Sequence, residues 1–107
     1  MSDLTDTNLS SEELRQKINL ETGKLGWPEL QRYFASGMVI VIDPALDLVD
    51  VAMQISQDNA SAISEWSESK LLWRAQDDDA TRWQENSAEF WAVVIAPWVV
   101  VQEYVSH

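Results

Sequence analysis

The sequence contains no cysteine, and its one histidine, His107, stands at the last position. The absence of cysteine excludes disulfides, thiolate metal sites and cysteine nucleophiles, and it fits a cytoplasmic protein. A terminal histidine is a poor general base or metal ligand, which argues against Ser-His-Asp triads and histidine metal sites. The three glycines, Gly23, Gly26 and Gly37, follow neither the Walker nor the dinucleotide-binding spacing, so the known phosphate-loop motifs are excluded as well.

Basic residues and long apolar runs are also scarce. Seven Lys and Arg stand against 18 Asp and Glu, for a formal net charge of −11, so we expect no nucleic-acid partner. The longest apolar run, residues 90–101, contains Pro97 and falls well short of a membrane helix, so we expect no membrane partner. Residues 1–10 are polar and lack the features of a signal peptide. We expect a flexible N-terminus over 1–10, a single globular domain over 11–105 and a tail at 106–107.

The clearest local pattern is a strand that leads into a helix. Residues 38–42 form an unbroken apolar run rich in β-branched side chains, bounded by Gly37 and Pro44. Such a run is typical of a strand that is covered on both faces. Asp43 ends this strand, and in open α/β sheets the carboxyl ends of strands are where ligands bind. Asp47 is placed to cap the helix that follows.

Helix signals recur along the rest of the chain. Ser10 and Glu13 have the spacing of a capping box and begin a first helix. Pro28 suits the first turn of a second helix, Asn59 is placed to cap another, and the three aspartates at 77–79 favour the start of the last.

Two further segments read as strands, residues 71–75 and the β-branched stretch 91–101. Pro97 marks a bulge, a bend between two strands or an edge position, and the pattern does not choose among these. The elements together predict an α/β fold, with α+β as the alternative. We expect a single-layer mixed sheet of about three to four strands with about five helices packed on it, in the order α-α-β-α-α-β-α-β(β).

Three aspartates at the strand end are the candidate metal site. Asp47 and Asp50 are three residues apart on one helical turn, and Asp43 lies just before that helix. Carboxylate oxygens in this arrangement suit Mg²⁺, the one cofactor that the pattern offers. The alternative is structural: Asp47 caps the helix, Asp50 stabilises the same helix end, and Asp43 terminates the strand.

A second candidate site, for an anion or a carboxylate-bearing ligand, lies at the junction of the first two helices. It consists of Glu21, Lys24, Trp27 and Arg32. The two cations supply charge, and the tryptophan ring supplies a platform. The alternative is a set of surface ion pairs, with Trp27 covering the core.

Six tryptophans are many for 107 residues. Most must be buried because each carries a large apolar area, but a domain of this size has little room for all of them. We therefore expect one or two at a surface that a partner covers. We place this interface at the C-terminal strand, with Trp98 as the first choice and Pro97 and Trp91 beside it.

Four segments, at residues 20–24, 27–34, 41–52 and 91–102, resemble a family of small bacterial proteins catalogued as domain of unknown function 2288. Their order and separation are the same as in that family, over about residues 12–103. The resemblance implies a bacterial, cytosolic, single-domain protein. It brings no assigned activity and no functional residues.

The leading hypothesis is a non-enzymatic interaction or regulatory domain, which binds a protein partner or a second copy of the chain through the C-terminal strand. It is supported by the lack of a nucleophile, of a usable histidine and of a phosphate loop. The alternative is a carboxylate-dependent metal-binding protein or small enzyme that uses Asp43, Asp47 and Asp50. A third hypothesis makes the acidic surface a nucleic-acid mimic for a basic protein. The sequence does not decide whether the protein is an enzyme, although the lack of a nucleophile and of a usable histidine favours a non-enzymatic protein.

Overall fold

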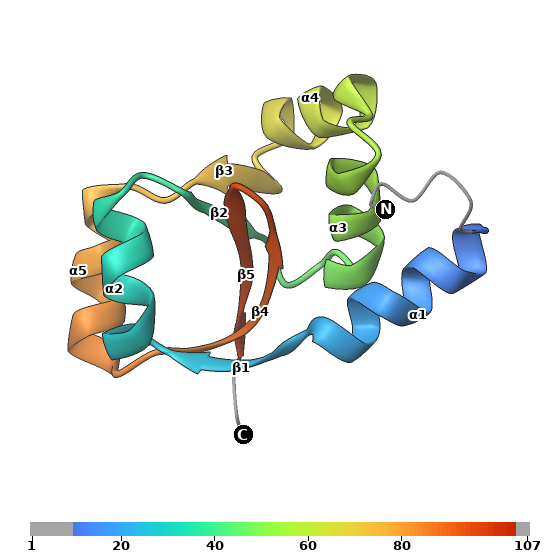
Figure 1. Cartoon of the computed structure of the whole chain (residues 1–107). Helices are drawn as coiled ribbons and strands as arrows, with labels where there is room; N and C mark the ends of the chain where they lie inside the picture. The colour runs from blue at the N-terminus through green and yellow to red at the C-terminus, as the bar shows by residue number, and fades with distance from the viewer. Residues whose placement is uncertain (1–9, 105–107) are drawn as a thin grey trace.

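The computed structural model describes residues 10–104, which form one five-stranded sheet with helices on both faces (Figure 1). The elements are, in order, α1 (Ser11–Glu21), β1 (Gly23–Gly26), α2 (Trp27–Ala35), β2 (Val39–Ile42), α3 (Leu48–Ser56), α4 (Ala60–Glu68), β3 (Leu72–Arg74), α5 (Asp77–Asn86), β4 (Glu89–Ile95) and β5 (Trp98–Tyr104). The predicted α/β class is confirmed. The predicted N-terminal segment, apart from Ser10, and the C-terminal tail with His107 lie outside the described residues.

The strands lie in the order β1-β4-β5-β2-β3. β5 and β2 are parallel, and the other neighbouring pairs are antiparallel. β4 and β5 form a hairpin that is closed by the pair Ile95 and Trp98. Its turn is Ala96-Pro97, joined by a cis peptide bond. Of the three roles considered for Pro97, a bend between two strands is the one that is found.

Alternate residues of the central strands contribute to two hydrophobic clusters, one on each face of the sheet. Ile42 and Val100 belong to the cluster covered by α1, α3 and α4. Val41 and Val101 belong to the cluster on the other face, which α2 and α5 cover. Burial on both faces explains why β2 is apolar throughout, as the sequence predicts.

The strand β1 is absent from the prediction, so the predicted number of strands and the predicted order of elements along the chain are both wrong at this point. The chain runs α-β-α at its start, whereas the sequence predicts two consecutive helices. Gly23 and Gly26 make up half of this strand, and glycine is disfavoured in strands, so the segment carries no strand signal of its own. The strand forms because residues 23–26 pair with residues 89–92 of β4. Its position is therefore decided by a neighbour that is more than sixty residues away in the sequence.

The helices begin where the sequence predicts. Glu13 N donates to Ser10 Oγ at 3.1 Å and Ser10 N donates to the Glu13 carboxylate at 2.9 Å, which is the predicted capping box. Asp47 and Asn59 are the N-caps of α3 and α4, and both accept hydrogen bonds from the first turn of their helix. Of the helices within residues 10–104, none has the length and apolar character needed to span a membrane.

Candidate functional sites

The structure gives each aspartate of the predicted metal site a partner of its own. Asp43 Oδ1 accepts a hydrogen bond from Ala45 N at 2.8 Å. Asp47 Oδ1 accepts from two backbone N–H groups of α3, and Asp50 forms an ion pair with Arg15. Within residues 10–104, no three His, Cys, Asp or Glu side chains gather closely enough to hold one metal ion. Asp43 and Asp47 make the turn and cap contacts of the structural alternative, whereas Asp50 pairs with Arg15 of α1.

The four residues of the second predicted site are not brought together. Trp27 is buried on the face covered by α2 and α5. Lys24 reaches over the opposite face, where its ammonium lies 4.4 Å from the centre of the Tyr104 ring. Arg32 stacks on the adjacent Tyr33, and Glu21 is exposed at the end of α1. These four side chains form no shared anion site.

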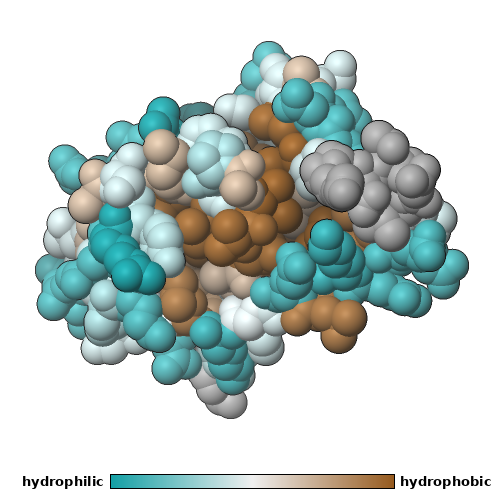
Figure 2. Space-filling model, viewed as in Figure 1, coloured by the Kyte–Doolittle hydropathy of each residue, from teal (hydrophilic) through white to brown (hydrophobic). Residues whose placement is uncertain are grey.

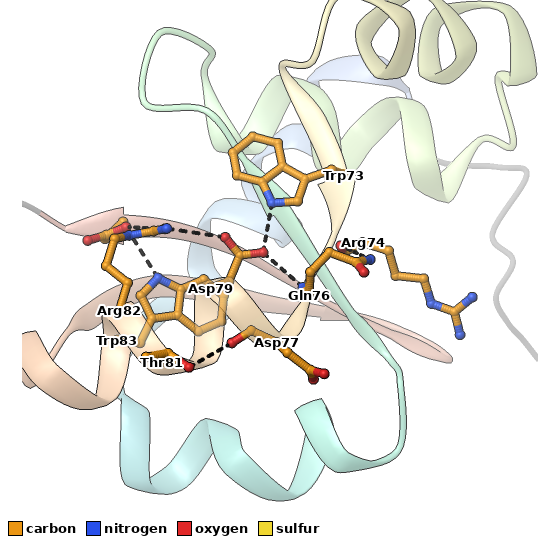
Figure 3. A network of polar contacts seen from close by, with 9 residues as sticks. Trp73, Arg74, Gln76, Asp77, Asp79, Thr81, Arg82 and Trp83 are labelled. Carbon is orange, nitrogen blue, oxygen red and sulfur yellow. Dashed lines mark hydrogen bonds and ion pairs between the residues drawn. The ribbon is translucent and has the colours of Figure 1, made fainter.

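A buried carboxylate fixes the start of α5 (Figure 3). Asp79 is 7% exposed, and its Oδ2 accepts from Gln76 N at 2.8 Å and from Trp73 Nε1 at 3.1 Å. Arg82 lies 3.4 Å from the other carboxylate oxygen and 3.5 Å from Glu103 on β5. This is the helix-start role that the sequence predicts for residues 77–79. It accounts for the buried charge without any catalytic role.

The tryptophans divide between the core and the surface. Trp27 and Trp83 are buried, and three others are half-buried: Trp66, Trp73 and Trp98. Trp91 is 37% exposed. Trp98, the first choice for an interface, packs against the core cluster below α3, and the Arg74 guanidinium lies 5.4 Å from its ring centre.

An open pocket lies at the carboxyl ends of the parallel strands β2 and β5, at the strand end where the sequence predicts a ligand. Its volume is about 440 Å³. It is lined by residues from α1, α3, β4 and β5, from the C-cap of α1 and from the N-cap of α3: Asn19, Thr22, Asp47, Leu48, Val49, Trp91 and Gln102.

Gln102 fixes one side of the pocket through its hydrogen bonds, and no motif in the sequence predicts this role. Its side-chain amide donates to the carbonyl oxygens of Asp43 at 3.1 Å and of Leu46 at 2.6 Å. These two bonds attach the loop after β2 to β5. The available signal is one polar side chain directly after the apolar run that ends at Val101. A polar residue at such a position needs a partner, and here the partner is the loop.

The outer edge of β4 is only half covered. β1 pairs with residues 89–92, whereas Val93, Val94 and Ile95 pair with β5 alone. Within residues 10–104, no other strand lies along this half of the edge. We call residues 93–95 the open edge. Val94, at its centre, is 60% exposed.

The surface around the open edge is apolar. Figure 2 shows a broad hydrophobic patch in the middle of this view, where the hairpin lies between the helices of the two faces in Figure 1. No charged residue occurs from position 90 to position 102. Soluble proteins usually protect a strand edge with charge, with proline in the strand or with a covering segment. β1 covers residues 89–92 and Pro97 lies in the turn, so within the described residues the open edge has no charge, no proline in the strand and no pairing strand.

Comparisons with known proteins support one family and one fold. A model of the family described as "Protein of unknown function (DUF2288)" matches residues 13–103. The NMR solution structure of PA1075 from Pseudomonas aeruginosa is similar to this chain, with 36% sequence identity and a TM-score of 0.78. The similarity covers 97% of this chain and 95% of that one. No curated protein matches the chain.

Proposed function

The chain belongs to the DUF2288 family, whose description names no activity, and we propose that it is a non-enzymatic interaction domain that pairs with a second copy of itself. The observation that carries this proposal is the open edge, where three consecutive residues of β4 have a strand partner on one side alone. An extended segment added at this position continues the ladder of backbone hydrogen bonds, as in other cases of strand addition. The partner segment is the same edge of the second copy.

Charge favours a second copy at this edge. Two molecules that each carry a net charge of −11 repel one another over most of their surfaces. The stretch from 90 to 102 is uncharged, so the two edges meet without bringing acid against acid. Antiparallel pairing of identical edges about a two-fold axis is also self-complementary, because each copy offers the same residues. The exposed Val94 of each copy lies at the centre of this contact.

The size of the open edge limits the affinity. Covering one valine contributes about 1.5 kcal/mol, and each added backbone hydrogen bond contributes about 0.5–1.5 kcal/mol. Association costs at least about 4 kcal/mol in lost freedom of motion. Two valines and about four hydrogen bonds therefore support only a weak dimer, with a dissociation constant no tighter than about 0.2 mM. The predicted interface residues Pro97 and Trp98 adjoin the edge and extend the contact, whereas Trp91 lies in the half of β4 that β1 covers.

Light scattering coupled to size-exclusion chromatography tests this proposal with Val94→Lys. Lysine places a charge at the centre of the edge, and the exposed position tolerates it without disturbing the core. We expect the mass of the wild type to rise above that of a monomer as its concentration approaches about 0.5 mM, the range of the estimated dissociation constant. We expect Val94→Lys to remain a monomer throughout.

Leu20→Lys is the matched control, because Leu20 is 84% exposed on α1 and lies outside the hairpin. We expect this variant to associate like the wild type. A wild type that stays monomeric over this range contradicts the proposal, and so does a dimer that Val94→Lys leaves intact. Trp98→Ala is a weaker probe because Trp98 also packs against the core.

A further inference from the structure

We infer that the pocket at the carboxyl ends of β2 and β5 binds a small organic cation, namely an ammonium or guanidinium group on an apolar stem. The pocket is separate from the open edge, so this inference does not depend on the proposed dimer. Its volume of about 440 Å³ lies within the range of small-molecule sites, which is roughly 300–1,000 Å³. Leu48 and Val49 of α3, together with the Trp91 ring, supply an apolar wall for the stem.

The polar groups of the pocket are mostly hydrogen-bond acceptors. Both N–H groups of the Gln102 amide are used by the loop after β2, which leaves its carbonyl oxygen for a ligand. The Thr22 hydroxyl donates to Ile18 O at 2.8 Å, so its oxygen can then only accept. Asp47 uses Oδ1 as the helix cap, and its Oδ2 makes no hydrogen bond to residues 10–104. A ligand that brings donors and positive charge matches these groups.

An anion does not match the pocket. Among the described residues that line it there is no Lys, Arg or His, and the side chains with N–H groups to offer are the uncharged Asn19 and Trp91. A divalent metal does not match either, because no group of three ligating side chains occurs within residues 10–104. Organic cations differ from metal ions in needing a single carboxylate and an apolar or aromatic surface.

The aromatic rings beside the pocket, those of Trp91 and Tyr104, already contact a cation of the chain itself. The Lys24 ammonium lies 5.4 Å from the centre of the Trp91 ring and 4.4 Å from that of Tyr104. Trp91 pairs with Lys24 on one side and with Gln102 on the other, so the pocket and Lys24 flank the same residue. Lys24 is then a like charge at the rim of the cation site. Removing that charge should strengthen the binding of a cation and weaken the binding of an anion.

Calorimetric titration with agmatine, a guanidinium and an amine joined by an apolar stem, tests the inference. Asp47→Asn removes the carboxylate charge but keeps the helix cap, since Asn and Asp cap helices equally well. We expect this variant to bind agmatine about tenfold more weakly, the order of effect expected for one lost charge contact near the surface. We expect Lys24→Met to bind it more tightly. Asp78→Asn, an exposed aspartate on α5, is the control and should bind as the wild type does.

Three results would overturn the inference. The first is that agmatine does not bind at about 10 mM, the ceiling for a meaningful weak site. The second is that agmatine binds the wild type and Asp47→Asn equally well. The third is that 1-pentanol, which has an apolar stem without a charge, binds the wild type as well as agmatine does. An acetylated and amidated Gly-Arg-Gly peptide separates two sources of the same chemistry. Tighter binding of the peptide indicates an arginine side chain of another protein, and tighter binding of agmatine indicates a free amine.

Discussion

Replacing Asp79 with alanine removes the acceptor on which the start of α5 depends. Asp79 is 7% exposed, and its carboxylate accepts from Trp73 Nε1 and Gln76 N (Figure 3). A buried donor that loses its acceptor costs about 1–3 kcal/mol. Most of this cost arises at Trp73, which is half-buried. Gln76 is exposed, so water replaces part of the hydrogen bond that its backbone N–H loses. Arg82 is 46% exposed, so its ion pair adds little.

The expected loss is therefore about 2–4 kcal/mol, a large part of the roughly 5–15 kcal/mol that stabilises a typical domain. With a urea dependence of about 1.5 kcal/mol per molar, the unfolding midpoint should fall by about 2 M. Asp78→Ala is the matched control, because Asp78 lies in the same helical turn but is exposed. Its cost should stay within about 0.5 kcal/mol. If the two variants unfold at the same urea concentration, the role assigned to the Asp79 network is refuted.

Three further predictions concern stability. Hydrogen bonds from the backbone N–H of Ser10, and then from its hydroxyl, lower the pKa of Glu13 from its usual value. The ionised Glu13 therefore stabilises the folded state above its unfolded-state pKa, and this stabilisation is lost as the pH falls through its folded-state pKa. Urea unfolding between about pH 7 and pH 3 should show a smaller loss on acidification for Glu13→Gln, and equal losses would contradict this assignment. Gly37→Ala should lower the unfolding free energy by about 1–2 kcal/mol because φ is 75° at this position, and an unchanged urea midpoint would exclude that strain. Gln102→Leu leaves the carbonyls of Asp43 and Leu46 without their donor and should lower the unfolding free energy by about 1–3 kcal/mol. Amide exchange in residues 43–47 should become faster, and unchanged exchange would show that the loop does not depend on Gln102.

Local chemistry accounts for the parts of the fold that the sequence predicts. The capping pair Ser10 and Glu13, the cap at Asp47 and the apolar run of β2 each depend on residues within a few positions of one another. β1 depends instead on pairing with distant residues of β4, and its glycines give no signal. Helix starts are therefore predictable here, whereas strand order and the number of strands are not.

The candidate sites follow the same division. The strand end after Ile42 is predicted as a ligand position from the α/β pattern, and the pocket does lie there. Gln102 and Trp91 reach that pocket from the C-terminal hairpin, and no spacing in the sequence shows that they meet the loop after β2. The open edge arises because β1 is shorter than β4, a mismatch that exists only once both strands are paired. Val94 is accordingly absent from the predicted interface, although its neighbours in the hairpin are present.

Pairing through the open edge is tested most directly by an isotope-filtered NMR experiment on a mixture of labelled and unlabelled protein at about 0.5 mM, where a weak dimer is populated. We expect intermolecular NOEs from the Val94 methyl groups to the hairpin of the other copy, and their loss in Val94→Lys. Intermolecular NOEs confined to another surface, or none at all, would contradict pairing through the open edge.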